Sequence, residues 1–187
     1  MARPSARLVR ALRITADRLE HPEVVYQWSH FGHCTCGHVA QTITKLEAST
    51  IYRAAFHRPG DWGEQAARLG RPELPDYGER PAIDEGAYEF ESLDRCVATG
   101  SPLAAILDTM YAAGLEPDDV RHLERLSDGE VLRWLGKNTT GLEHAKREHV
   151  IAYLRGFAEL LASKLDPRER AELEADAACE ALPLAAE

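Results

Sequence analysis

Apolar residues recur every three or four positions along most of the chain, which is the spacing of one face of an α-helix. Near the N-terminus this pattern predicts a helix that ends before Pro22, because the residue before a proline avoids the helical conformation. A long helix is expected over about residues 37–57, ended by Pro59-Gly60, and a short one over 61–69. No segment alternates apolar and polar residues with the period of two that strands require.

Capping signals mark the helix starts in the second half of the chain. Proline stands where a first helical turn is expected, and two segments fit the capping box, in which a hydroxyl and a carboxylate satisfy exposed N–H groups. The sequence therefore predicts an all-α, bundle-like single domain over residues 1–187, with six to eight helices and a tail, 166–187, that can fray. These signals are Ser101-Pro102, Pro117, Ser127 to Glu130, Thr140 to Glu143, and Asp166-Pro167.

One segment, residues 71–94, breaks the helical pattern. It contains three prolines and two glycines, and its eight acidic residues face only two arginines, Arg71 and Arg80. Turn-forming residues and a run of like charge are typical of a solvated surface segment. We expect an irregular acidic excursion here rather than a boundary between domains.

Composition and charge narrow the class of protein. The 187 residues are 44% hydrophobic and 28% charged, which is typical of a globular chain, and the net charge of −9 argues against nucleic-acid binding. No run approaches the roughly 20 apolar residues of a membrane helix, and the arginine-rich N-terminal stretch has no secretory core. We therefore expect a cytoplasmic protein with reduced thiols. A homo-oligomer is compatible with this sequence, and the sequence does not identify which small molecule could be a substrate.

The strongest chemical signal is a cluster of metal-ligating residue types near the start of the predicted long helix. Five such residues fall within nine positions, and two glycines, Gly32 and Gly37, allow tight backbone turns around them. Imidazole nitrogen and thiolate sulfur are the ligands that zinc prefers, with iron as the alternative. The spacing matches no zinc-ribbon pattern, so the local density is the signal. The five residues are His30, His33, Cys34, Cys36 and His38.

The position of this cluster at a helix start predicts its electrostatics. With Thr35 as N-cap, Cys36 becomes the first helical residue and lies at the positive end of the helix. That end favours a thiolate, so we expect a depressed cysteine pKa. Two or three local ligands would need one more from a distant helix. His149, expected on the buried face of a helix that starts near residue 142, is the leading candidate, although a satisfied core histidine is the plainer interpretation.

Three functions remain open from the sequence. The first is a zinc- or iron-binding helical protein, with a hydrolase-type site if one coordination position stays open. The second is a cysteine-dependent enzyme or thiol redox sensor that uses Cys34 or Cys36 with a neighbouring imidazole. The third is a helical scaffold in which the cluster has no chemical role.

Overall fold

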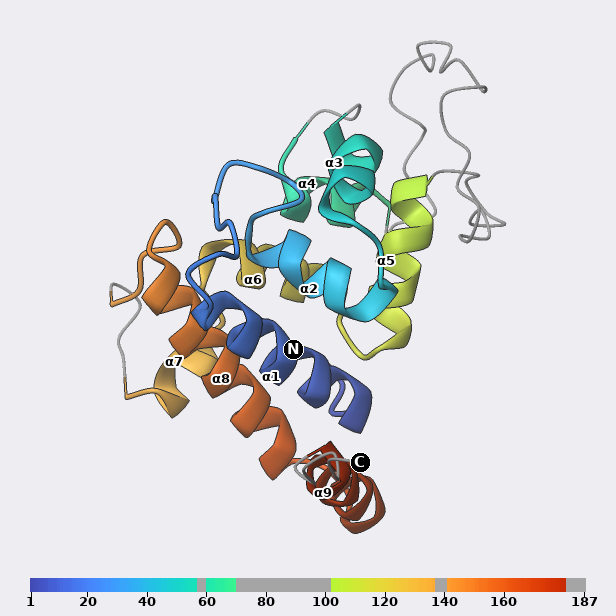
Figure 1. Ribbon diagram of the computed structural model, residues 1–187, viewed down its shortest axis with the longest axis vertical. Coiled ribbons are helices and arrows are strands. Elements are labelled where there is room, and N and C mark those ends of the chain that lie inside the picture. The colour runs from blue at the N-terminus through green and yellow to red at the C-terminus, as the bar shows by residue number, and fades with distance from the viewer. Residues whose placement is uncertain (57–59, 70–101, 137–140, 181–187) are drawn as a thin grey trace, which may run out of the picture.

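The computed structural model describes the backbone of residues 1–56, 60–69, 102–136 and 141–180, and the side chains of these ranges as far as residue 175. Within these ranges the chain forms nine α-helices and no strand (Figure 1), so the predicted all-α class is confirmed. The predicted acidic segment 71–94 and the capping residue Thr140 lie outside the described residues. The helices are α1 (Ala6–Glu20), α2 (Thr35–Thr44), α3 (Ala48–Phe56), α4 (Trp62–Leu69), α5 (Pro102–Ala112), α6 (Pro117–Arg125), α7 (Gly129–Trp134), α8 (Arg147–Ser163) and α9 (Pro167–Glu180).

The expected single helix over 37–57 is wrong, because the chain forms two helices there, and this break accounts for the ninth helix. Lys45 ends α2 in the left-handed conformation, with φ 64°. The Thr44 hydroxyl donates to the Ala40 carbonyl (2.7 Å) and accepts from the Leu46 N–H (3.3 Å). Such local side-chain bonds compete with the helical ladder, so a run that looks periodic in sequence stops at Thr44.

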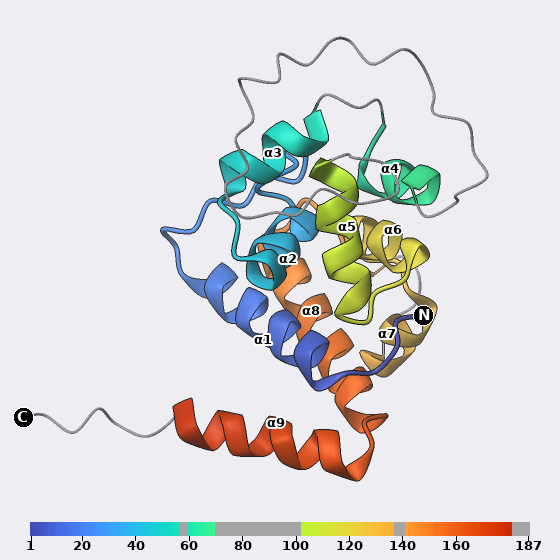
Figure 2. The same ribbon diagram turned by 90° about the vertical axis from the view of Figure 1, so that its right-hand side faces the viewer.

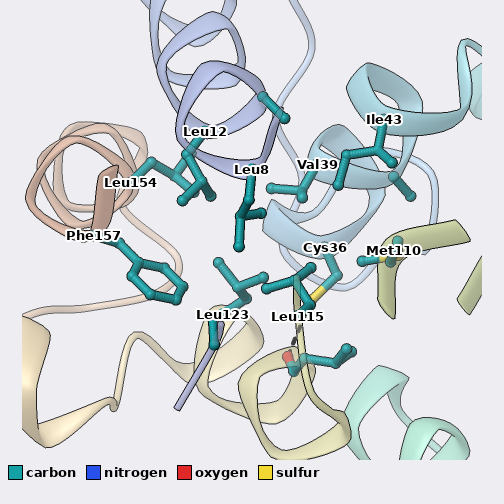
Figure 3. Packing of buried hydrophobic residues seen from close by; sticks show 14 of the residues in the cluster. Leu8, Leu12, Cys36, Val39, Ile43, Met110, Leu115, Leu123, Leu154 and Phe157 are labelled. Atoms are coloured by element: carbon teal, nitrogen blue, oxygen red, sulfur yellow. Dashed lines mark hydrogen bonds between the residues drawn. The ribbon is translucent and has the colours of Figure 1, made fainter. Parts of the chain in front are cut away.

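The core lies between α1, α2, α5, α6 and α8, and α1 and α8 lie side by side (Figures 1 and 2). The helical spacing of α1 buries Leu8 and Leu12 completely, and they meet Leu154 and Phe157 of α8 (Figure 3). Ser5 starts α1 by accepting the Leu8 N–H at 3.1 Å. This core fixes where the start of α2 lies, because the buried face of α2 is part of it.

Helix starts after residue 101 follow the sequence signals with small differences. Helices α5, α6 and α9 begin at the predicted prolines, and the Asp166 carboxylate accepts the Arg168 N–H at 2.8 Å. The N-cap of α7 is Asp128, one residue after the predicted Ser127, because its carboxylate reaches the N–H groups of the first turn. Helix α8 begins at Arg147 rather than near residue 142.

The C-terminal helix α9 crosses the ends of α1 and α8 and extends beyond the bundle (Figure 2). Among the side chains of α9 up to residue 175, Leu173 is buried, at 5% exposure. None of the helices in the described ranges is long and apolar enough to cross a membrane.

Candidate metal centre

The turn that carries the cluster is built by its own backbone. The His30 carbonyl accepts the N–H groups of His33 (2.9 Å) and Cys34 (2.8 Å), which closes one helical turn just before α2. The N-cap of α2 is Cys34 rather than the expected Thr35, since the Cys34 sulfur accepts the Gly37 N–H at 3.4 Å. Helix α2 therefore begins one residue earlier than the sequence predicted, and Cys36 is its second residue rather than its first.

Both cysteine sulfurs are buried and engaged. Cys36 is 0% exposed, and its thiol donates to the Val120 carbonyl of α6 at 3.3 Å, among the core leucines (Figure 3). Burial raises the pKa of Cys36 well above its ordinary value, and neighbouring Cys34 and the acidic Glu124 add to the effect. The expected depression of its pKa is wrong, because loss of hydration outweighs the positive end of the helix.

The three imidazoles follow one another along the turn and into α2. The ring centroids of His30 and His33 are 4.5 Å apart, and those of His33 and His38 are 6.2 Å apart. His30 and His33 are half-buried, whereas His38 is only 2% exposed. The series thus runs from the partly exposed surface to the interior.

His38 has one satisfied and one unsatisfied nitrogen. Its Nε2 donates to the Val25 carbonyl at 2.9 Å, because the carbonyl can only accept, and this leaves a lone pair on Nδ1. Nδ1 is buried and has no hydrogen-bond partner. An unsatisfied buried acceptor is costly, so its presence calls for an explanation.

The surroundings keep His38 neutral. Burial is the main cause that lowers its pKa from 6.5 to about 4, and the positive charges of Arg18 and Arg147 and the nearby His33 act in the same direction. The Val25 carbonyl opposes the shift without cancelling it. The pKa of His33 is also lowered, first by burial and then by His30. At neutral pH these two imidazoles have the uncharged form that binds a metal.

The neutral state of His38 predicts acid sensitivity of the fold. Since its folded pKa of about 4 lies below the ordinary 6.5, the unfolded chain binds the proton more readily. The stabilisation is complete above about pH 6.5 and is lost as the pH falls toward 4, by at most about 3 kcal/mol. Urea unfolding at several pH values should show a steeper acid loss in the wild type than in His38→Gln, and equal slopes would contradict this.

The structure gives His149 a separate role. It is half-buried, and its Nδ1 accepts the Glu143 N–H at 2.9 Å, in the loop that leads into α8. His149 therefore has a hydrogen-bond partner, but it is half-buried rather than the core histidine that the sequence suggested.

Two contacts of the centre were not foreseen. Tyr52 of α3 stacks on His30, with centroids 4.3 Å apart, and the Val25 carbonyl orients His38. The break at Lys45 brings α3 back over the turn. The continuous helix that the sequence suggested would not place Tyr52 beside His30, so the first contact could not be expected from it. The second involves a backbone group, which no side-chain pattern signals.

Within the described residues, no three His, Cys, Asp or Glu side chains converge closely enough to hold a metal ion as they stand. No known protein family, no curated protein and no solved structure matches this chain. A function for this protein can therefore be inferred only from the contacts within this chain.

Proposed function

We propose that this protein binds a divalent transition metal, zinc first and iron second, through the imidazoles of His33 and His38, with His30 as a third ligand. The observation that supports it is the buried, unpartnered Nδ1 of His38. A metal ion would satisfy this lone pair, which no hydrogen-bond donor reaches.

The hydrogen bond on the opposite nitrogen supports this assignment. Metal-bound histidines commonly donate their second ring N–H to a backbone carbonyl, which fixes the tautomer and aims the lone pair. His38 has this arrangement, with Val25 as the carbonyl. The lowered pKa of His38 removes the competing proton at neutral pH.

The spacing of the rings is close to what one ion needs. With zinc–nitrogen bonds of about 2.0–2.1 Å at tetrahedral angles, the centroids of two ligating rings lie roughly 5 Å apart. The observed separations, 4.5 Å and 6.2 Å, lie on either side of this value. Rotation of the half-buried His33 ring would bring it toward His38, whereas His30, whose Nδ1 accepts the Gly32 N–H at 3.1 Å, would have to release that hydrogen bond to bind the ion.

Neither cysteine is needed in this proposal. The Cys36 thiol donates a hydrogen bond to the Val120 carbonyl, and the Cys34 sulfur accepts the Gly37 N–H at the start of α2. A zinc ion held by these three imidazoles would supply an activated water, which is the chemistry of a hydrolase-type site.

Metal titration of the untagged protein tests the proposal. We expect one equivalent of Zn²⁺ to bind the wild type, and His38→Ala to weaken binding by at least about tenfold, because the buried ligand is lost. His149→Ala is the matched control and should leave binding unchanged. Absence of stoichiometric binding, or equal affinity in His38→Ala, would overturn the proposal.

Cobalt substitution separates imidazole ligands from thiolate ligands. Co²⁺ bound by nitrogens alone gives no sulfur-to-cobalt charge-transfer band, whereas a Cys34 or Cys36 ligand gives an intense one. We expect the band to be absent and Cys36→Ala to retain the metal. An intense band that disappears in Cys36→Ala would mean that the metal is bound by both imidazole and thiolate ligands, and would contradict a site of imidazoles alone.

A further inference from the structure

The loop between α1 and α2 supplies the hydrogen bond that fixes the ring of His38. The His38 Nε2–H donates to the Val25 carbonyl at 2.9 Å, which leaves on Nδ1 the lone pair assigned to the metal. The Val25 side chain is 56% exposed, so it packs little against the core. The position of the Val25 carbonyl therefore depends on what holds the residues on either side of it.

Arg147 holds the residues just before Val25. It is the first residue of α8, and it donates one guanidinium N–H to the His21 carbonyl at 3.3 Å and another to the Val24 carbonyl. A planar guanidinium can bind two acceptors at once in a fixed geometry, whereas the ammonium of a lysine is a point charge on a flexible stem. The backbone that leads into Val25 is therefore fixed by two hydrogen bonds from α8.

Tyr26 anchors the residue just after Val25. Its hydroxyl donates to the His144 carbonyl, in the loop before α8, and lies 3.3 Å from the Thr35 hydroxyl at the start of α2. The peptide unit that carries the Val25 carbonyl joins Val25 to Tyr26. Both ends of this unit are thus anchored to the segment that leads into α8.

The charge and the geometry of Arg147 have opposite effects on a metal ion at His38. Its positive charge is among the causes that lower the pKa of His38, and the same repulsion disfavours a divalent cation on Nδ1. Its two hydrogen bonds favour the cation, because they hold the loop whose carbonyl selects the Nε2–H tautomer of His38. The direction in which metal affinity changes therefore distinguishes the two effects.

We propose that Arg147 is a positioning residue for the metal centre, a role that rests on the proposed function. Its two hydrogen bonds keep the Val25 carbonyl aimed at His38, so that Nδ1 stays free for the ion. When they are lost, the Val25 carbonyl is no longer fixed, and His38 also populates the tautomer whose Nδ1 carries the proton and cannot bind a metal. Helix α8 thereby contributes to the centre without supplying a ligand.

Zinc titration of two Arg147 variants of the full, untagged chain separates positioning from charge. Loss of a direct hydrogen-bond partner of a metal-bound histidine weakens affinity about 10- to 100-fold, and Arg147 acts one contact further away, so we expect Arg147→Gln to weaken zinc binding by about three- to tenfold. Arg147→Lys keeps the charge but lacks the planar fork, and should also weaken binding. Zinc affinity equal to or tighter than that of the wild type in Arg147→Gln, or equal affinity in Arg147→Lys, would overturn the proposal.

Arg155→Gln is the matched control on the same helix. Arg155 also joins α8 to the end of α1, through ion pairs with Asp17 at 2.9 Å and Glu20 at 2.8 Å, and these contacts are made with α1 rather than with the loop that holds Val25. We expect its zinc affinity to equal that of the wild type. The same loss of affinity in Arg155→Gln would show that general loosening of α8 is the cause, and would also overturn the proposal.

Nitrogen-15 NMR of metal-free protein with labelled histidine reads the tautomer of His38 directly. We expect the Nε2–H form alone in the wild type and in Arg155→Gln, and a mixture of both forms in Arg147→Gln; a single Nε2–H form there would overturn the role of Arg147. If Arg147→Gln does not fold, Arg147→Lys serves for both measurements. Absence of zinc binding by the wild type would instead overturn the proposed function, and the tautomer would still decide whether Arg147 orients His38.

Discussion

Gly37→Ala is expected to lower the free energy of unfolding by about 3 kcal/mol. A Cβ at this position would lie 2.1 Å from the Phe31 carbonyl oxygen and 2.7 Å from the carbonyl carbon of Gly32. Both are backbone atoms that cannot rotate away, so the turn before α2 must move as a unit. Since that turn carries His30 and His33, we expect zinc binding to be weakened together with stability.

Chemical denaturation followed by circular dichroism measures this effect, and Gly129→Ala is its matched control. The first residue of α7 is Gly129, where the nearest atom to an added Cβ is 4.0 Å away. Alanine is the better helix former, so the control should be neutral or stabilised by up to about 1 kcal/mol. Equal losses in the two variants would show that close approach at Gly37 is not the cause.

Phe157→Ala should destabilise the fold by about 3–5 kcal/mol, the usual cost of removing a fully buried phenylalanine. Phe157 is 0% exposed and lies on α8 between Leu154 and the leucines of α1 and α6 (Figure 3). Its ring also packs near Tyr153, with centroids 6.2 Å apart. The surrounding helices are fixed by their other contacts, so the cavity can close only in part.

Trp134→Ala provides the comparison for this loss. Trp134 is a larger aromatic residue but is 51% exposed, so its removal should cost less than about 1 kcal/mol. Urea unfolding of the wild type, Phe157→Ala and Trp134→Ala gives the free energy of unfolding of each, and hence the loss caused by each substitution. A loss below about 1 kcal/mol for Phe157→Ala would mean that the core between α1 and α8 is not close-packed.

Local sequence signals predicted the helices well where packing and propensity agree. The periodic apolar face of α1 and the prolines at the starts of α5, α6 and α9 each specify a helix through neighbouring residues alone. The break after Thr44 was missed because the apolar spacing continues through it. There a threonine hydroxyl bonded to the backbone, rather than the hydrophobic pattern, decides where α2 ends.

The residue types in the sequence indicated the cluster around the start of α2. They did not indicate which role each of its residues has. Cys36 and His38 are two positions apart and looked equally suited to hold an ion. In the fold the Cys36 sulfur bonds to Val120, which is 84 residues away in the sequence, and His38 bonds to Val25. Only the imidazole keeps a buried nitrogen without a partner.

The sequence by itself determined that the chain is helical and that imidazoles and thiols are concentrated before one helix, since both properties depend on residues close together in the chain. Tertiary structure alone decided that α3 turns back over the cluster, that Cys36 is a core thiol, and that Glu124 of α6 accepts the Gly63 N–H of α4. The physical reason is that hydration and charge set the protonation of a group, and both are supplied by helices distant in the sequence.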